Sequence, residues 1–293
     1  MSYYILAGFA GLAAAALVAF HLETKRFVVN RYAIASSKLP EAFCGVKFAL
    51  ISDLHNMVYG EGNSKLFLAI EEEKPDFILI AGDMLVAKRG EDFSPAVEFL
   101  QKISARYPVY YSYGNHECRL RDWERYGSMA QDYEVAIKDL PLHMLHNRKV
   151  RMERGGQSIS ICGLEIGKEF FYGLWPHNGM TGRYLEKRLG KAESGVFHIL
   201  IAHNPLYFPA YAEWGADLVV SGHNHGGIVT VPFLGGLVDP NMRLFPKYDK
   251  GLFKERNTQM VLSAGTGSHS PYFRAFNPPE LVIVTLEREG ESG

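Results

Sequence analysis

Cysteine is scarce in this chain. Cys44, Cys118 and Cys162 are the three cysteines among 293 residues, and no two of them have CxxC spacing. An odd number of widely spaced cysteines excludes a disulfide framework and a zinc knuckle. We interpret them as free thiols, as is usual in a reducing compartment.

An excess of positive charge is also absent. The chain has 31 Lys and Arg against 32 Asp and Glu, which gives a formal net charge of −1. Without an overall basic field, no specific binding of nucleic acid is expected. There is no internal repeat, and the length suits one large domain or two small ones. The oligomeric state stays open.

The first twenty residues differ from the rest. Residues 3–20 contain no charged side chain, and their 18 residues are near the lower limit for a membrane-spanning helix. A cleaved signal peptide is the alternative, but no Lys or Arg precedes the apolar run. Lys25, Arg26 and Arg31 follow it, which favours a cytoplasmic C-terminal side. We predict a single-pass anchor in the cell membrane over residues 1–25, and a cytoplasmic domain over residues 26–293.

Apolar runs alternate with amphipathic segments in the first half of the domain. Runs over 46–51, 77–81 and 108–113 predict buried strands, whereas apolar residues recur at helical spacing over 64–73 and 94–104. Strands that alternate with helices are typical of a parallel sheet with crossover helices. Further strands are expected over 27–34, 158–162, 197–202, 218–221, 260–263 and 281–286, and helices over 122–138 and 183–189. Residues 229–253 read as a strand followed by a long loop.

Five of the predicted strands end in side chains that can bind metal. These are Asp53, His55, Asp83, Asn115, His116, His203, His223 and His225. Each has a structural explanation of its own, since Asp83 could be a helix N-cap, Asn115 a turn residue and His203 a buried histidine. Ligands of open α/β sheets bind at the carboxyl ends of strands. The repetition at five strand ends therefore favours a single site.

The residue types suit a centre of two metal ions. Seven of the groups, leaving His116 aside, can share two divalent cations if one carboxylate bridges them. Imidazole mixed with carboxylate favours Mn, Fe or Zn over Ca or Mg. Because only two carboxylates oppose two divalent charges, the site should attract a phosphate oxyanion. A bound water would be activated as the nucleophile.

These motifs resemble the signature of the calcineurin-like metallophosphoesterase superfamily. The matching blocks are Asp53-x-His55, Gly82-Asp83, Gly114-Asn115-His116-Glu117, His203 and Gly222-His223-Asn224-His225. The chain is also similar to a bacterial branch of that superfamily that has one N-terminal membrane helix. Many members of this branch have a polar residue where Ile228 stands here. The resemblance implies an α/β fold, a four-layer αββα sandwich with two facing mixed sheets.

The resemblance also implies a role for each residue of the site. Asp53, His55 and His225 would hold the first metal ion, Asn115, His203 and His223 the second, and Asp83 would bridge the two. His116 and Asp83 would be the catalytic residues, with His116 near the leaving-group oxygen rather than on a metal. Glu117 would either orient His116 or be an ordinary charge at a helix start.

The expected activity is that of a metal-dependent phosphohydrolase. It would cleave a phosphodiester, pyrophosphate or phosphomonoester bond, with the diester favoured. The substrate would be a phosphorylated small molecule or, given the anchor, one linked to a membrane lipid. The alternatives are a non-catalytic binding scaffold with the same fold and a metal site with redox chemistry.

Two segments and a tail motif have open roles. The aromatic residues 170–175 and the loop 232–253 would either form an apolar wall for acyl chains or pack together as a small extra core. Arg274 and Asn277, near the C-terminus, would either contact the site or only fix a turn.

Overall fold

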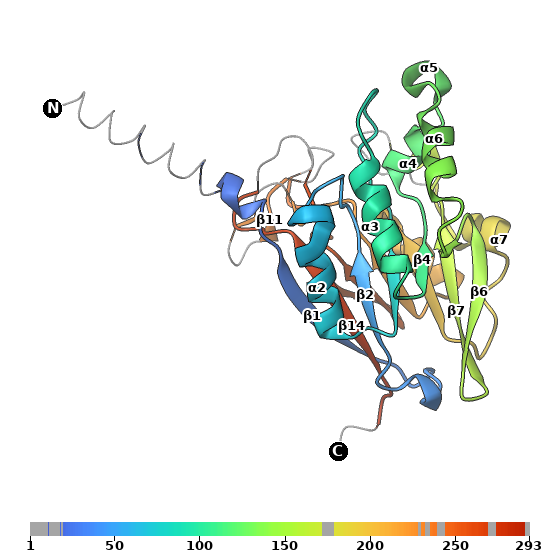
Figure 1. The fold of residues 1–293 in the computed structure, drawn as a ribbon. Helices are drawn as coiled ribbons and strands as arrows, with labels where there is room; N and C mark the ends of the chain where they lie inside the picture. Colours follow the sequence, from blue (N-terminus) through green and yellow to red (C-terminus); the bar gives the residue numbers. More distant parts are fainter. Residues whose placement is uncertain are drawn as a thin grey trace.

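Two six-stranded sheets face each other in this computed structural model (Figure 1). The structure describes residues 11, 18, 20–171, 179–227, 230–231, 235–238, 244–268 and 274–290. The strands of the first sheet, in spatial order, are β1 (Val28–Ala35), β14 (Glu280–Glu287), β2 (Lys47–Ile51), β3 (Phe77–Ile80), β4 (Val109–Tyr111) and β5 (Leu142–Met144). Those of the second are β12 (Gly251–Glu255), β13 (Thr258–Leu262), β9 (Leu218–Ser221), β8 (His198–Ala202), β7 (Gln157–Leu164) and β6 (Arg148–Arg154).

Both sheets are mixed. In the first, β2, β3, β4 and β5 are parallel, as the alternation of strands and helices predicts, and β14 is antiparallel to β2. In the second, β7, β8, β9 and β13 are parallel, while β6 and β12 run antiparallel at the edges. Parallel strands place their carboxyl ends at one edge of a sheet. Each sheet therefore brings the ends of several strands together.

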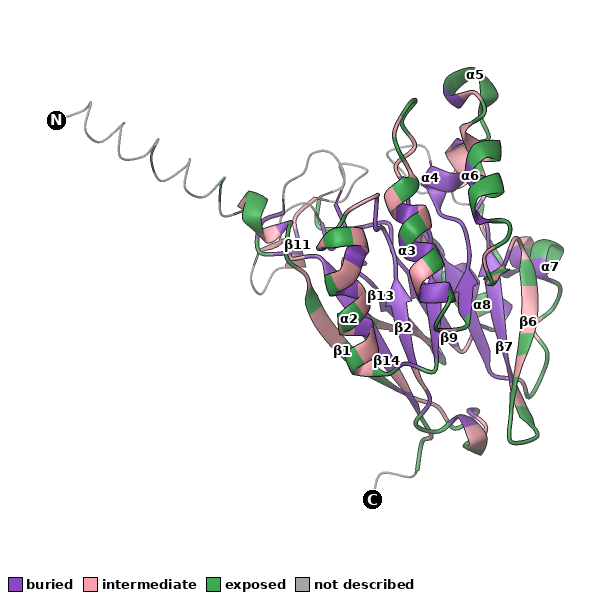
Figure 2. Ribbon diagram, viewed as in Figure 1, coloured by how far each residue is buried: buried purple, intermediate pink, exposed green. Residues whose placement is uncertain are grey.

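Helices cover the outer face of each sheet. The helices beside the first sheet are α2 (Ser64–Glu73), α3 (Ser94–Ser104), α4 (Asn115–Arg119), α5 (Trp123–Tyr126) and α6 (Met129–Ile137); those of the second are α7 (Gly182–Leu189) and α8 (Phe208–Trp214). The predicted four-layer αββα sandwich is confirmed. Figure 2 shows the helices buried toward the sheets and exposed on the opposite side.

The pleat of the strands explains why they are apolar on both faces. Phe48 and Leu50 of β2 lie in the core between the two sheets, whereas Ala49 and Ile51 belong to the core under α2 and α3. Successive side chains of a strand point to opposite faces, so a strand with both faces covered reads as an uninterrupted apolar run. This is why the sequence shows no alternation there.

Several elements differ from the sequence-based prediction. The single helix expected over 122–138 is two helices, α5 and α6, because Gly127 between them has a φ of 63°. Helix α8 was not predicted. Over 229–253, the strand β10 (Thr230–Val231) lies where a strand was expected, but the expected loop also contains the short strand β11 (Gly235–Gly236) and the start of the edge strand β12.

The predicted membrane anchor lies largely outside the described residues. Among the residues that the structure does describe, no helix has the length and apolar character needed to cross a membrane. Near the end of the predicted anchor, the Phe20 ring contacts the Phe276 ring at 5.5 Å, and Glu23 accepts a hydrogen bond from the Phe276 backbone. The start of the described chain therefore rests on the tail segment that carries Arg274.

The burial of Leu79 in the core between the sheets predicts a large contribution of this side chain to stability. This residue of β3 is fully buried there, so Leu79→Ala should lower the free energy of unfolding by about 2–5 kcal/mol through lost burial and a residual cavity. The matched control is Leu68→Ala on α2, where the side chain is 55% exposed and the loss should be under about 0.5 kcal/mol. Urea denaturation would measure both, and equal losses would contradict the assignment of the core.

Candidate metal centre

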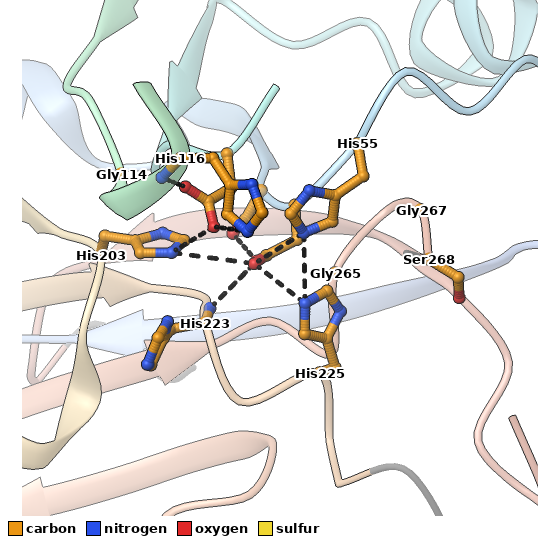
Figure 3. A network of polar contacts seen from close by, with 12 residues as sticks. His55, Gly114, His116, His203, His223, His225, Gly265, Gly267 and Ser268 are labelled. Carbon is orange, nitrogen blue, oxygen red and sulfur yellow. Dashed lines mark hydrogen bonds and ion pairs between the residues drawn. The ribbon is translucent and has the colours of Figure 1, made fainter. Parts of the chain in front are cut away.

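The predicted site residues all follow directly after strands of the two sheets. Asp53 and His55 come after β2, Asp83 after β3, Asn115 and His116 after β4, His203 after β8, and His223 and His225 after β9. All eight are buried. In Figure 3 the imidazoles of His55, His116, His203 and His225 converge on one point. The two sheets therefore bring together residues up to 172 positions apart, Asp53 and His225 being the outermost.

Much of the site is built on left-handed backbone. Asp53, His55, Asp83, His223 and His225 all have a positive φ, between 50° and 74°. This conformation is uncommon for residues other than glycine, and it is enriched at functional sites. It turns the chain sharply after β2, β3 and β9, where these five residues lie.

Glycines let these strand ends touch. A Cβ added to Gly114 would lie 2.2 Å from Asp83 Oδ1, and one added to Gly222 would lie 1.7 Å from Ser52 Oγ and 2.2 Å from Asp53 Oδ2. No side chain fits at either position. The glycines in the Gly-Asn-His and Gly-His-Asn-His motifs are therefore needed because another strand end occupies the space beside them.

Asp53 lies at the centre of the cluster. Its Oδ1 is 3.4 Å from His225 Nε2, 3.7 Å from His55 Nε2 and 3.8 Å from His203 Nε2. Its Oδ2 accepts hydrogen bonds from the His223 backbone and from the Ser52 hydroxyl. The His223 N–H is also 3.2 Å from Oδ1, so Oδ2 is held by the protein alone, while Oδ1 shares that N–H and also faces the imidazoles.

The two carboxylate oxygens of Asp83 also have different partners. Oδ1 accepts the backbone N–H of His116 at 2.8 Å, and Oδ2 is 3.0 Å from His203 Nε2 and 3.9 Å from His116 Nε2. Ligand atoms of Asp83 group with those of His203 and His223, and also with those of His55 and His116. Asp83 therefore lies between two sets of imidazoles, the position that a bridging ligand requires.

Glu117 supports the backbone rather than His116. Its carboxylate accepts hydrogen bonds from the backbone N–H groups of Asp83, Met84 and Gly114, and from the Tyr111 hydroxyl. The carboxylate thus holds the end of β3 against the start of α4, and the predicted contact with His116 is not among its bonds. Burial, and then the charge of Asp83, raise the pKa of Glu117.

Two histidines have the tautomer that a metal ligand needs. His55 Nδ1 is 3.3 Å from the Leu85 carbonyl, and His203 Nδ1 is 2.5 Å from the Ala81 carbonyl. Each Nδ1 therefore donates its proton to a carbonyl oxygen, which leaves Nε2 directed at the carboxylates. A hydrogen bond of this kind on the far nitrogen is the usual support of a metal-bound histidine.

His116 has the opposite arrangement. Its Nδ1 accepts the Ala87 backbone N–H at 2.8 Å, so the neutral ring carries its proton on Nε2. Nε2 points to the side of Asp83 where the other imidazoles lie. A nitrogen that bears a proton cannot bind a cation, but it can donate that proton. The structure thus separates His116 from the other histidines by its tautomer.

Arg274 and Asn277 both contact the site and fix its backbone. The buried Arg274 guanidinium donates to the carbonyls of Ala264 and Gly267 and to Nδ1 of His225, and Asn277 donates to the His225 carbonyl. Burial lowers the pKa of Arg274 to about 10. If His225 offers Nε2 to a cation, its Nδ1 takes the proton, so the contact with the guanidinium would then have to change.

The electrostatics of the cluster favour positive charge between the carboxylates. Burial opposes ionisation of Asp53 and Asp83, but the surrounding histidines hold both pKa values below the usual range. Burial also opposes the charge on His203, yet Asp83 and Asp53 raise its pKa to about 10. Burial lowers the pKa of His223 to about 3, and the nearby charges of His203 and Arg119 act in the same direction.

The donor set fits divalent cations. Ligand atoms of Asp53, His55 and His225 lie within 4.8 Å of one another, and so do those of Asp83, His203 and His223. Asn115 Oδ1 is buried and has no hydrogen-bond partner among the described residues, as expected of an oxygen that a cation would satisfy. The clustered histidine and aspartate side chains thus form a candidate site for divalent metal.

Aromatic rings close one side of the cluster. The Phe171 ring is 5.5 Å from the His223 ring and 6.4 Å from the His203 ring, and Phe170 packs against Tyr184 and Tyr207. Residues 172–178, which include most of the predicted aromatic segment, lie outside the described residues. In the loop expected over 232–253, Tyr248 packs against Phe208 and Phe253, while Leu244 and Phe245 are exposed.

The three backbone contacts of Glu117 predict that it contributes to the stability of the fold and to metal affinity. Glu117→Gln replaces one acceptor oxygen by an amide that opposes a buried N–H, so the free energy of unfolding should fall by about 1–3 kcal/mol. Affinity for Mn²⁺ should fall as well, because Asp83 loses its support. Glu124→Gln, on the exposed side of α5, is the control and should change neither quantity. Unchanged stability in Glu117→Gln would contradict this role.

The raised pKa of His203 predicts how stability depends on pH. The pKa of His203 is about 10 in the folded protein, so the proton is kept up to about pH 10, whereas the unfolded chain loses it near 6.5, the ordinary pKa of histidine. This contribution is complete below pH 6.5 and is lost as the pH rises toward 10. The melting temperature of the metal-free protein should therefore fall between pH 7 and 10, and less steeply in His203→Asn. His143→Asn, at an exposed position, should keep the wild-type slope; equal slopes in all three would refute the idea.

Comparison with known proteins agrees with this geometry. The family model described as calcineurin-like phosphoesterase matches residues 46–227. The chain is 26% identical to the uncharacterized metallophosphoesterase YkuE of Bacillus subtilis, over 95% of this chain and 94% of that protein. It is 27% identical to a transmembrane protein with a metallophosphoesterase domain from Danio rerio, over 87% of this chain and 56% of that protein.

Among solved structures, the phosphopantetheinyl hydrolase of Mycobacterium tuberculosis is 14% identical with a TM-score of 0.45, over 78% of this chain and 91% of that chain. The family model covers more than half of the chain, and it contains every residue of the cluster from Asp53 to His225. The chain therefore belongs to the calcineurin-like phosphoesterase family.

Proposed function

We propose that this protein is a metal-dependent phosphohydrolase with two divalent cations, and that it cleaves phosphodiester bonds in preference to phosphomonoesters. One observation carries the proposal. Two groups of ligand atoms, one around Asp53 and one around Asp83, lie side by side, with Asp53 Oδ1 3.8 Å from His203 Nε2 of the other group. The two groups share no residue, and Asp83 also groups with His55 and His116, which supports a pair of cations with Asp83 between them rather than a single cation.

The residues that would hold the cations are those that the sequence predicts. Asp53, His55 and His225 suit the first, Asn115, His203 and His223 the second, and Asp83 lies between them. The mixed nitrogen and oxygen donors favour Mn, Fe or Zn. When bound, such cations supply Lewis acidity, which offsets the charge of a phosphate group and lowers the pKa of water.

His116 is the proposed general acid. The Ala87 N–H fixes the neutral ring with its proton on Nε2, next to Asp83, where a phosphate would lie. The side chain is only 9% exposed, so little water competes for that proton. Donation to the departing oxygen helps most when the leaving group is a poor one, such as an alkoxide. This supports an alkyl phosphoester, whose alcohol product needs a proton, and the preference for a diester over a monoester is a further part of the proposal.

A membrane-linked substrate is the finer part of the proposal. The uncharged residues 3–20 support an anchor, and the exposed side chains of Leu244, Phe245 and Phe276 supply apolar surface on the described part of the chain. We propose a single-pass protein whose domain faces the cytoplasm and acts on a phosphate linked to a lipid or to another apolar group.

Two substitutions separate the proposed roles. Asp83→Asn should lose bound metal and hydrolysis together. His116→Asn should keep its metal and lose about 10²–10⁴-fold in kcat on an alkyl phosphodiester, and less on 4-nitrophenyl esters, whose leaving group needs little protonation. The full chain, loaded with Mn²⁺, would be assayed with bis(4-nitrophenyl) phosphate and 4-nitrophenyl phosphate, and its metal measured by elemental analysis. We expect about two ions per chain and faster cleavage of the diester.

The matched control is Asp139→Asn, at an exposed position outside the site. It should retain both metal and activity. Unchanged hydrolysis in Asp83→Asn would refute the active site, and a folded wild-type protein that binds no metal would refute the proposal as a whole. Bound metal without hydrolysis of either compound would favour a binding scaffold.

A further inference from the structure

A pocket of about 470 Å³ opens beside the metal centre, between α4–α5 and the short helix η3 (Lys168–Phe170). Asn115 and Phe171 belong both to its lining and to the surroundings of the centre, since Asn115 is a predicted ligand and the Phe171 ring contacts His223. The pocket is therefore continuous with the place where a phosphate would be cleaved. Its volume suits a ligand of small-molecule size.

The pocket lining is rich in cations. Arg119, Arg121, Arg125 and Lys168 line it, against the acidic side chains of Asp122 and Glu124. Asp122 also caps α5, where its carboxylate accepts the Arg125 backbone N–H. Positive charge on a wall that adjoins a phosphate site is suited to a second anionic group of the same ligand.

Arg119 connects the pocket to the centre. It follows Asn115 by four residues on α4, so the two side chains lie on the same face of the helix. Its charge also acts on His223, whose lowered pKa is due first to burial and then to nearby positive charges. A ligand group bound near Arg119 would therefore lie close to the phosphate at the centre.

Arg121 is held in a fixed position. It donates two hydrogen bonds to Glu165, at 2.9 and 3.2 Å, and lies over the Tyr113 ring at 5.6 Å. Glu165 also pairs with His146. These contacts hold the wall of the pocket in place, whereas Arg125, which is exposed and lies over its neighbour Tyr126, can turn toward a ligand.

Trp123 gives the pocket an apolar side. This indole lines the pocket and is 60% exposed, which is unusual for so large a ring. Exposed tryptophan next to arginine is suited to a flat ring or an apolar chain that carries a phosphate.

We propose that this pocket binds the part of the substrate beyond the scissile phosphate, with a second anionic group on Arg119 and Arg125 and a flat ring or apolar chain on Trp123. The inference rests on the proposed phosphohydrolase function and specifies its substrate class. That class is an organic compound with two phosphate groups, one for the metal centre and one for the pocket.

Two probe compounds distinguish a flat ring from an apolar chain as the group that Trp123 binds. ADP-ribose carries two phosphates and a flat base, while dihexanoyl phosphatidylinositol 4-phosphate carries two phosphates and short acyl chains. Calorimetric titration of the full-length His116→Asn protein loaded with Mn²⁺, in which hydrolysis is slow, would measure the Kd of each. We expect at least one to bind, and Arg125→Ala and Trp123→Ala each to raise that Kd at least 10-fold. A lower Kd for ADP-ribose would identify a flat ring as the group bound at Trp123, and a lower Kd for the phosphatidylinositol 4-phosphate would identify an apolar acyl chain.

Arg106→Ala is the matched control. This exposed arginine follows α3 and pairs with Glu71, away from the pocket, so its loss should leave both Kd values unchanged. In the metal-loaded protein, Arg125→Ala and Trp123→Ala should raise KM for the preferred probe if the probe is hydrolysed, or its inhibition constant if it is not. This increase should be larger than the increase in KM for bis(4-nitrophenyl) phosphate. An equal loss for both compounds would indicate only a structural role and would overturn the inference.

The two proposals fail in different ways. Hydrolysis of bis(4-nitrophenyl) phosphate without binding of either probe, or with binding that neither substitution weakens, overturns the pocket and leaves the phosphohydrolase intact. Binding that the substitutions weaken, in a protein that hydrolyses nothing, supports the pocket as a ligand site and overturns the proposed activity.

Discussion

The arrangement of the site depends on the cost of burying two carboxylates. Asp53 and Asp83 have at most 2% of their surface exposed, and an isolated buried charge is strongly unfavourable. The fold offsets that cost with a backbone N–H group on each carboxylate and with imidazoles that face one oxygen of each. The remaining negative charge is what a divalent cation would neutralise. The same constraint explains why His203 holds a proton in the metal-free protein.

The supports of the carboxylates come from outside the ligand set. Glu117 fixes the turn that carries Asp83, and Arg274 fixes the loops around His225. Both are buried and charged, which is tolerable only because their hydrogen bonds are satisfied. They also stabilise left-handed turns that cost of order 1–3 kcal/mol each. The geometry of the centre is therefore held by residues that would never bind a metal.

Family membership and geometry together limit the chemistry. Calcineurin-like phosphoesterases act on phosphoesters, and the buried cluster supplies donors that suit divalent metal. The pocket beside the centre adds cations and an exposed indole that the hydrolytic step does not require. Such features are suited to selecting a substrate. In this protein the core of the site and its outer wall therefore have separate tasks, as the position of Asn115 between them illustrates.

The sequence by itself determined the strands with crossover helices and the members of the cluster, while the two-sheet sandwich was implied only by the resemblance of its motifs to a known family. Apolar runs that end in Asp53, Asp83, Asn115, His203 and His223 mark buried strands and their functional ends, because a strand covered on both faces leaves polar residues only at its tip. It left the role of Glu117 open between orienting His116 and a charge at a helix start. The carboxylate does accept the Gly114 N–H at the start of α4, but its bonds to Asp83 and Met84, 34 and 33 residues away, were not predicted, and neither was α8. Only the tertiary structure decided the tautomer of His116, the contacts of Arg274 and the pocket with Trp123. Each of these depends on contacts between segments that are far apart in the sequence and meet across the two sheets. The spacing of residues along the chain does not reveal such contacts.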